Sequence, residues 1–210
     1  MERHSPILQL IALLFLLHHL LSHNLASTTI DLKPDKSSLL AFKSRITDDS
    51  FDTTLGKNWT TKTSVCNWIG VTCGSHHRRV IALEISYMSL EGTIPPHIGN
   101  LSFLVYLNIT GNHFHGDLPK ELVHLSQLRV VDFSNNGFAG DLPKELAHLH
   151  RLRVVDFSSN NFAGELPRTW FGNMTDLEEL HLNLNGFSGM ITLSLGYRYF
   201  YGLIALTCMT

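Results

Sequence analysis

The chain has 210 residues, of which 44% are hydrophobic, and a formal net charge of −2 at pH 7. This length allows one domain with a small additional cap, and the apolar content is ordinary for a globular chain. The nearly neutral charge argues against a nucleic-acid partner, which requires a basic patch.

The first segment has the pattern of a secretory signal peptide. Arg3 and His4 precede a nearly continuous apolar run over residues 7–21, and the small residues Ala26 and Ser27 follow it. The alternative is a membrane anchor, but the run is shorter than the roughly 20 residues that span a bilayer. We predict a signal peptide over residues 1–26, which directs the chain into the secretory route.

Residues 27–76 differ in composition from the rest of the chain and are predicted to form an N-terminal cap. Apolar residues recur with helical spacing from residue 37 to 46, and Asp35 and Ser37 are candidate helix caps. Trp59 and Trp68 lie farther along in the same segment. The chain from residue 77 to 192 consists of repeats that must stack on one another. The first repeat of such a stack exposes its apolar interior, so a cap of this kind is needed to cover it.

Two of the three cysteines, Cys66 and Cys73, lie within this cap, while Cys208 stands alone near the end. In a secreted chain this spacing favours a disulfide, which would contribute roughly 2.5 kcal/mol by closing a short loop. The alternative is a metal site, but it lacks two further ligands at suitable spacing even though His76 and His77 are close by. We therefore predict a Cys66–Cys73 disulfide and no metal.

From residue 77 to 192 the chain repeats the pattern LxxLxLxxNxFxGxLP five times, with a period of 24 residues. Each unit supplies one short strand and one turn. No unit can bury its own apolar face, so neighbouring units must stack. The expected fold class is an α/β leucine-rich-repeat solenoid, with a short parallel β ladder on its concave face and the helical, disulfide-closed cap at its N-terminus.

Within the repeats, aligned residues form columns with separate structural roles. Two inward apolar columns precede a column of asparagines, whose amides can bond backbone groups in the turn of the adjacent repeat. A column of phenylalanines stacks behind them. The asparagines are Asn112, Asn136, Asn160 and Asn185, and the phenylalanines are Phe114, Phe138, Phe162 and Phe187. After Gly189 the pattern breaks, and residues 193–210 are predicted to be a tail outside the repeats.

Sequons for N-glycosylation, Asn-x-Ser/Thr, support passage through the secretory route. They are candidate N-glycosylation sites, and the sequence does not determine which of them carry a glycan. They are Asn58, Asn100, Asn108 and Asn173.

Residues that flank the inward columns in each strand point to the concave face and form the candidate binding surface. Asp132 and Asp156 would stack as like charges about 4.8 Å apart, which is destabilising unless compensated. Either Arg129 and Arg153 compensate them and make a self-neutral face, or the face docks a cationic or mixed-charge peptide. The sequon at Asn108 also falls in this face. The candidate binding residues are Tyr106, Arg129, Asp132, Arg153, Asp156, Glu178 and His181.

The cap and repeats together resemble the ectodomains of plant leucine-rich-repeat receptor-like kinases. The resemblance lies in DKSSLLAFKSRI, NW at 58–59, CNWIGVTC, RRVIALEI and GTIPPHIGNLSFL, and it covers residues 35–191. It implies an extracellular recognition module that binds a peptide or another leucine-rich-repeat ectodomain in defence or developmental signalling. It also implies that full-length relatives are anchored in the membrane, carry more repeats and continue into a cytoplasmic kinase.

The chain itself contains no glycine-rich ATP loop, HRD or DFG motif, so we predict no catalytic residues, no cofactor and no enzyme activity. We expect it in the apoplast or at the outer face of the plasma membrane. Two other functions are compatible with the sequence, a secreted inhibitor of cell-wall-degrading enzymes like the polygalacturonase-inhibiting proteins, and a truncated receptor product without function. The tail fits a shortened receptor, or an improvised cap that uses Tyr197, Tyr199, Phe200 and Tyr201.

Overall fold

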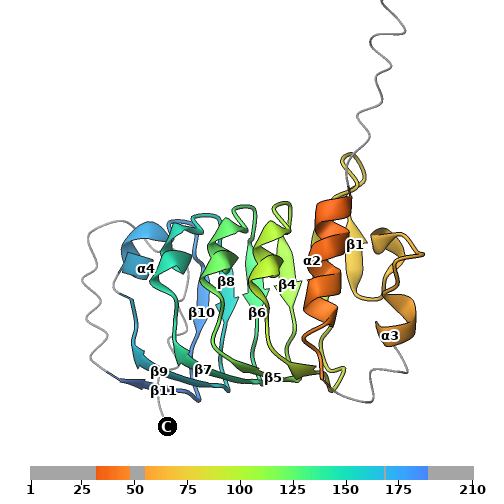
Figure 1. Cartoon of the computed structure of the whole chain (residues 1–210). Helices are drawn as coiled ribbons and strands as arrows, with labels where there is room; N and C mark the ends of the chain where they lie inside the picture. The colour runs from red at the N-terminus through yellow and green to blue at the C-terminus, as the bar shows by residue number, and fades with distance from the viewer. Residues whose placement is uncertain (1–31, 48–54, 168, 189–210) are drawn as a thin grey trace, which may run out of the picture. The chain divides into compact units, whose positions relative to one another are not determined.

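The repeats form a ladder of short strands in which each strand pairs with the strand of the next repeat (Figure 1). The computed structural model describes residues 32–47, 55–167 and 169–188. The predicted signal peptide, the tail and Cys208 lie outside the described residues. One sheet has the order β1-β2-β4-β6-β8-β10, with β1 antiparallel and the others parallel to their neighbours. Its strands are β1 (Val71–Cys73), β2 (Val80–Glu84), β4 (Tyr106–Asn108), β6 (Val130–Asp132), β8 (Val154–Asp156) and β10 (Glu179–His181).

The register of this sheet aligns the first inward column from repeat to repeat. Leu107 pairs with Leu83 on one side and with Val131 on the other, and Val155 pairs with Leu180. All five side chains are at most 3% exposed. Burial of one such side chain contributes about 1.5–3 kcal/mol, so the stacking of repeats supplies the core that a single repeat lacks. The predicted parallel ladder is confirmed.

A second parallel sheet, which the sequence analysis did not predict, runs along the F-x-G segments in the order β11-β9-β7-β5-β3. Each repeat places the same extended segment at the same offset, so backbone N–H and C=O groups that would otherwise be unpaired meet those of the next repeat. Gly140 lies within it at φ +76°, a conformation that glycine adopts without steric cost. The strands are β3 (Glu91–Gly92), β5 (His113–Gly116), β7 (Gly137–Asp141), β9 (Asn161–Glu165) and β11 (Gly186–Ser188).

Short helices return the chain from the second sheet to the first. Pro95, Pro119 and Pro143 occupy the N-cap positions of the three 3₁₀ helices, where a residue without an N–H and with a fixed φ is well tolerated. In the portion of the chain that the structure covers, no helix has the length and apolar character needed to cross a membrane. These helices are η3 (Pro96–Asn100), η4 (Lys120–His124), η5 (Lys144–His148) and α4 (Thr169–Asn173).

The phenylalanine column forms a continuous stack through the core. The ring centroids of Phe114 and Phe138 are 6.3 Å apart, and those of Phe138 and Phe162 are 6.1 Å apart. Phe187 continues the stack at 6.2 Å from Phe162. The three inner rings are 0% exposed. The predicted stacking is confirmed, and it joins the second to fifth repeats through side chains as well as backbone.

The asparagine column ties the turns of adjacent repeats together, as predicted. Oδ1 of Asn136 accepts the Phe114 N–H of the preceding repeat at 3.0 Å. Its Nδ2 donates to the Ile109 carbonyl of the preceding repeat at 3.1 Å, and to two carbonyls of its own turn. Asn112, Asn160 and Asn185 make equivalent bonds. One side chain per repeat therefore satisfies several backbone groups that the turn would leave unpaired.

The cap begins with helix α2 (Lys33–Lys43), earlier than the expected range of 37–46. Leu32 is its N-cap, and Pro34 in the first turn suits the start of a helix. The expectation that Asp35 and Ser37 cap this helix is wrong, because both lie inside it. Asp35 is only 1% exposed, and the hydroxyl of Ser37 donates to the Lys33 carbonyl at 2.7 Å.

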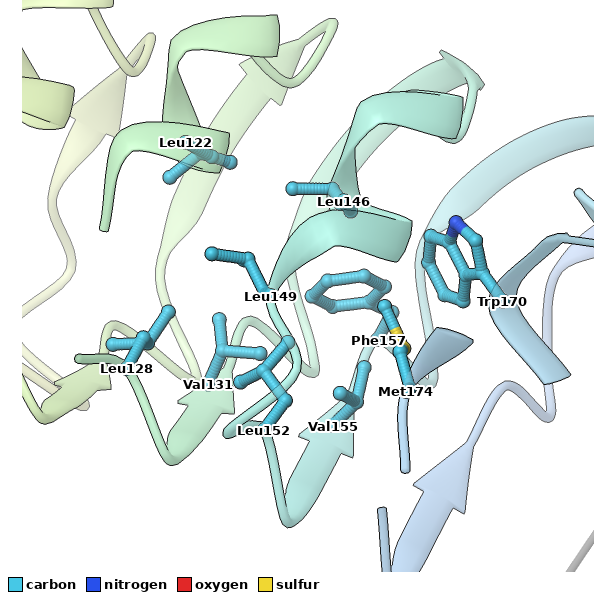
Figure 2. Close-up of a pocket in the computed structure, with 10 residues that line it drawn as sticks. All are labelled: Leu122, Leu128, Val131, Leu146, Leu149, Leu152, Val155, Phe157, Trp170 and Met174. Carbon is cyan, nitrogen blue, oxygen red and sulfur yellow. The ribbon is translucent and has the colours of Figure 1, made fainter. Parts of the chain in front are cut away.

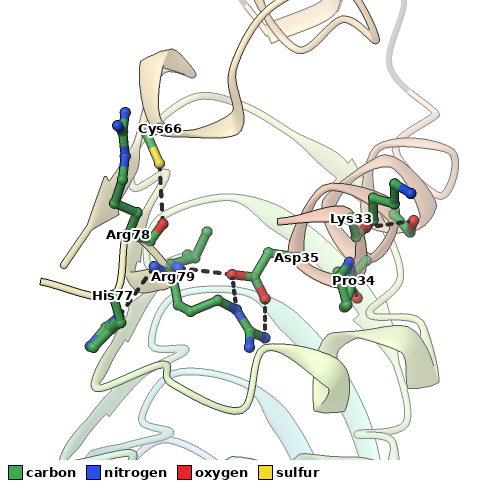
Figure 3. Close-up of polar contacts among 10 residues, drawn as sticks. Lys33, Pro34, Asp35, Cys66, His77, Arg78 and Arg79 are labelled. Carbon is green, nitrogen blue, oxygen red and sulfur yellow. Dashed lines mark hydrogen bonds and ion pairs between the residues drawn. The ribbon is translucent and has the colours of Figure 1, made fainter. Parts of the chain in front are cut away.

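Asp35 instead joins the cap to the first repeat (Figure 3). Its carboxylate accepts hydrogen bonds from Nε and Nη2 of Arg79 at 2.8 and 2.7 Å, and from the Val80 N–H at 2.9 Å. Arg79 also lies over the ring of Phe103, 4.7 Å from its centroid. A buried carboxylate needs such partners, so this pair fixes α2 against the start of β2.

The rest of the cap contains α3 (Leu55–Asn58), η2 (Val65–Asn67) and β1, closed by the predicted Cys66–Cys73 disulfide, which is present. Trp59 and Trp68 stack with their ring centroids 5.3 Å apart. The indole N–H of Trp59 donates to the Ile69 carbonyl at 3.0 Å, so its polar atom is satisfied in the core. The tryptophans and the disulfide form the lid over the first repeat.

Candidate functional site

The concave face is built from the strand residues that alternate with the inward column. Register places Ala82, Tyr106, Val130, Val154 and Glu179 in one row across the strands. A second row consists of Glu84, Asn108, Asp132, Asp156 and His181. The strands therefore bring four of the seven predicted binding residues into two adjacent rows. The other three, Arg129, Arg153 and Glu178, precede β6, β8 and β10 by one residue and follow the same repeat.

The first row is mostly apolar and half-buried. Tyr106, Val130 and Val154 all retain intermediate exposure, and they stand side by side because their strands are in register. Side chains in this state lose further apolar surface when a partner covers them, which favours binding. This row forms an apolar strip about one side chain wide on the concave face.

The two aspartates of the second row are compensated locally. Oδ1 of Asp132 accepts the Ser134 N–H at 3.0 Å and the Ser134 hydroxyl at 2.7 Å. Asp156 accepts the same pair of bonds from Ser158 at 2.9 and 2.6 Å. This is the turn that an aspartate makes with backbone two residues ahead. The serine two positions after each aspartate, in the sequence Asp-Phe-Ser, indicates this turn, and the prediction did not take it into account.

The arginines do not pair with these aspartates. Arg153 donates through Nε to Oε1 of Glu178 at 2.8 Å, with both side chains about half exposed. In the described part of the chain Arg129 takes part in no ion pair, and it is exposed. The expectation that Arg129 and Arg153 neutralise Asp132 and Asp156 is therefore corrected. The serines supply the close donors, and Arg129 is left facing solvent.

His181 and Glu178 complete the face at its last strand. His181 is half-buried, and its Nε2 lies 3.4 Å from Oε2 of Glu179, within ion-pair distance when the ring is protonated. The face thus carries both signs of charge, with Arg129, Asp132 and Asp156 on its middle strands. Arg153, Glu178, Glu179 and His181 lie toward its last strand. Among the described residues, no group of three His, Cys, Asp or Glu side chains is arranged to hold a metal ion.

Asn108 departs from its expected position. It lies in the concave row but is only 9% exposed, because Nδ2 donates to the Tyr106 hydroxyl at 3.1 Å and Oδ1 accepts the Thr110 N–H at 3.0 Å. Asn100 and Asn173 are exposed, while Asn58 is half-buried and its Oδ1 accepts the Ile69 N–H at 2.6 Å. The four sequons are therefore not equivalent in the folded protein.

We predict that the folded protein, when it is expressed through the secretory pathway, carries glycans on Asn100 and Asn173 and none on Asn108. A glycan on Nδ2 of Asn108 would displace its bond to Tyr106 and would have to fit among buried ladder residues, whereas the two exposed sites have room for a bulky sugar. Mass spectrometry of peptides after enzymatic deglycosylation in heavy-oxygen water measures occupancy at each site. As a control, Asn100→Gln should remove one glycan and Asn108→Gln none. A labelled Asn108 peptide from folded protein would contradict the prediction.

An apolar cavity lies behind the ladder, between the strands and the short helices (Figure 2). Leu122, Leu146 and Trp170 border it from the helices, and Val131 and Val155 border it from the strands. Its surface is apolar, and the one polar side-chain atom among its lining residues is the buried indole Nε1 of Trp170, which has no hydrogen-bond partner among the described residues. A ligand site of ordinary kind has several polar groups that orient the ligand. The cavity belongs to the core, and the concave face is the candidate site.

Comparisons with known proteins agree with this architecture. The family model described as the leucine-rich repeat region matches residues 70–192, and the model of the leucine-rich repeat N-terminal domain matches residues 32–74. The chain is 45% identical over 80 residues to the LRR receptor-like serine/threonine-protein kinase EFR of Arabidopsis thaliana. That stretch is 38% of this chain and 8% of the kinase, so the chain spans a small part of this relative.

Solved structures of plant receptor ectodomains have the same fold. The BIR2 ectodomain from Arabidopsis thaliana superposes with a TM-score of 0.68 at 30% identity, covering 74% of this chain and 82% of that one. PEPR1, in its complex with AtPEP1, gives a TM-score of 0.71 at 30% identity and covers 76% of this chain and 22% of its own.

Proposed function

Since this chain belongs to the leucine-rich repeat family, we propose that it is the extracellular recognition module of a plant receptor-like protein and binds an extended peptide on its concave face. It performs no chemical step of its own. It acts in the apoplast or at the outer face of the plasma membrane, in defence or developmental signalling. The similarity to EFR and to PEPR1 in complex with AtPEP1 supports this function.

The observation that carries the proposal is that the residues that hold the scaffold together differ from the exposed residues of the concave face. The asparagines satisfy the turns, and the outward Asp132 and Asp156 accept hydrogen bonds from the serines. The side chain of Arg129 takes part in none of these contacts. Arg129 is exposed beside the half-buried row of Tyr106 and Val130. Exposed charge next to an apolar row is the composition of a surface that recognises a partner, with aromatic and arginine side chains as its anchors.

The chemistry of the face indicates which peptide fits. An apolar side chain packs on the Tyr106–Val130 row, an acidic group meets Arg129, and a basic group meets Asp132 or Asp156. Five strands at about 4.8 Å spacing extend over roughly 19 Å, which an extended peptide covers with about six residues. The interface is small, so we expect modest affinity from this chain alone.

Selection from a displayed library of random peptides, followed by calorimetry with the selected synthetic peptide, tests this function. We expect Arg129→Ala to weaken binding by about tenfold or more, as for a residue that anchors an interface. His113→Ala is the matched control, because His113 is exposed on β5 in the other sheet, and it should leave binding unchanged. A peptide whose binding depends on His113 and not on Arg129, or a failure to select any peptide, would argue against the concave site.

A further inference from the structure

In each of the five repeats, the chain turns from the first sheet to the second through a residue with a left-handed backbone conformation (Figure 1). Glycine and asparagine adopt this conformation readily, but it is uncommon for a bulky side chain. The first repeat nevertheless places a tyrosine there, and its N–H donates to the Thr110 carbonyl of the second repeat at 2.9 Å. These aligned residues, the turn row, have φ values from +53° to +66° and are Tyr87, Gly111, Asn135, Ser159 and Leu184.

The ring of Tyr87 is held in place and open to solvent. The residue is 74% exposed, more than the other large hydrophobic residues at the surface of the described part of the chain. Its ring lies directly against Gly111, where an added Cβ atom would overlap it. The next three repeats make the same turn with Gly, Asn or Ser, so the fold does not require an aromatic ring here. An uncommon backbone conformation that the fold does not require indicates a functional role for this residue.

An open hollow of about 520 Å³ lies next to this ring, on the other side of the turn row from the inward columns. It exists because Gly111 and Gly137 leave space where the adjacent repeats carry side chains. Its volume is within the range of small-molecule sites, about 300–1,000 Å³. The lining residues are Gly111, Asn112, His113, Asn135, Asn136 and Gly137.

The polar groups of the hollow are uncharged amides and an imidazole. Asn112 and Asn136 use their amides to hold the turns. The imidazole of His113 and the amide oxygen of Asn135 have no hydrogen-bond partner among the described residues, and both side chains are exposed. No Asp, Glu, Lys or Arg side chain lines the hollow. The site therefore offers an aromatic surface together with neutral donors and acceptors.

We propose that this hollow and Tyr87 form a binding site for a neutral oligosaccharide. The C–H groups on one face of a pyranose ring pack on Tyr87, because they carry a small positive charge and the face of an aromatic ring is negative. Sugar hydroxyls donate to and accept from His113 and Asn135, since a hydroxyl has both capacities. Tyr87 and Asn135 are two repeats apart, roughly 10 Å at the usual strand spacing, so two or more sugar units fill the site.

A peptide fits this hollow less well than a sugar. Extended peptides are recognised through unpaired backbone groups at a sheet edge and through pockets for their side chains. Here the Gly111 and Asn135 N–H groups already donate to the Ser134 and Ser158 carbonyls, both at 3.0 Å. The hollow also contains none of the outward strand residues of the concave face, such as Arg129. The sugar site is therefore separate from the peptide site proposed above.

Binding of the full chain to immobilised oligosaccharides tests the proposal. The probes are neutral fragments of β-glucan, xylan and mannan, with oligogalacturonates as the acidic comparison, followed by calorimetry with the best soluble fragment. We expect a neutral fragment to bind better than the acidic ones, because the hollow has no cationic side chain among its lining residues. Binding of acidic fragments alone, or of no fragment, would overturn the proposal.

Substitutions in the turn row assign the binding to Tyr87. We expect Tyr87→Ala to weaken binding by about tenfold or more, as for an aromatic anchor, and Tyr87→Phe to retain it. Leu184→Ala is the matched control, because Leu184 has the same backbone conformation and is 56% exposed, but does not line the hollow. It should leave the affinity unchanged. Unchanged affinity in Tyr87→Ala, or equal losses in Tyr87→Ala and Leu184→Ala, would contradict the site.

A variant that fills the hollow gives a second, independent test. Gly137→Asn introduces the residue that the fourth repeat carries at this position, Asn161, so the fold accommodates it. We expect it to weaken sugar binding by about tenfold while the circular dichroism melting curve stays the same. Arg129→Ala should leave sugar binding unchanged, so that failure of the peptide site and failure of the sugar site are distinguishable. Undiminished sugar binding in folded Gly137→Asn would place the sugar elsewhere and overturn the proposal.

Discussion

Phe138→Ala is expected to lower the free energy of unfolding by about 3–5 kcal/mol, the range for removing a large buried aromatic side chain. Phe138 is 0% exposed and stacks on Phe114 and Phe162, with Phe133 tilted against it at 5.5 Å. It stands in the middle of the column, so its loss weakens the contacts to the repeats on both sides. In a solenoid, stability is carried by such contacts between neighbours.

Urea unfolding followed by circular dichroism measures this loss. Phe103→Ala is a suitable control, because Phe103 is 37% exposed and lies outside the column. It should cost less than half as much as Phe138→Ala. Similar losses for the two variants would show that the stack contributes little beyond ordinary burial, and that the repeats are joined mainly through their backbone.

Asp35→Ala is expected to destabilise the protein by about 3–5 kcal/mol, the usual cost of removing one partner from a buried ion pair. The carboxylate holds the Arg79 guanidinium through two hydrogen bonds and also accepts the Val80 N–H. Without it, the largely buried Arg79 guanidinium loses its carboxylate and the Val80 N–H loses its acceptor. The effect should appear first in the cap, where Trp59 and Trp68 report unfolding by fluorescence.

The exposed pair of Arg153 and Glu178 provides the comparison. Both side chains are about half exposed, so Glu178→Ala should change stability by at most about 1 kcal/mol. The double variant Asp35→Ala, Arg79→Ala should recover part of the loss, since the buried guanidinium that lost its carboxylate is then removed as well. If Asp35→Ala costs no more than Glu178→Ala, the cap is not held by this pair.

Much of the fold could be predicted because the same pattern occurs five times. The spacing of Leu83, Leu107 and Val131 determines the ladder, and Asn136 and Phe138 have counterparts at the same positions in the second, fourth and fifth repeats. The spacing of Cys66 and Cys73, in a chain that is expected to be secreted, was sufficient to predict the disulfide. The roles of Tyr106, Arg129 and His181 in binding stay predictions, because the repeat pattern places them on the concave face but does not identify what binds there.

The sequence by itself determined the repeat, the inward columns and the rows of the concave face. The repeat period is sufficient for this, because it fixes which residues of neighbouring repeats lie side by side. Only the tertiary structure decided which polar groups meet. Asp35 and Arg79 are 44 residues apart and belong to segments of different composition, so no local pattern links them. The donors to Asp132 come from Ser134 and not from Arg129, because the turn brings the serine N–H and hydroxyl to the carboxylate. An ion pair with Arg129 would instead require a long surface side chain to lose rotamer entropy.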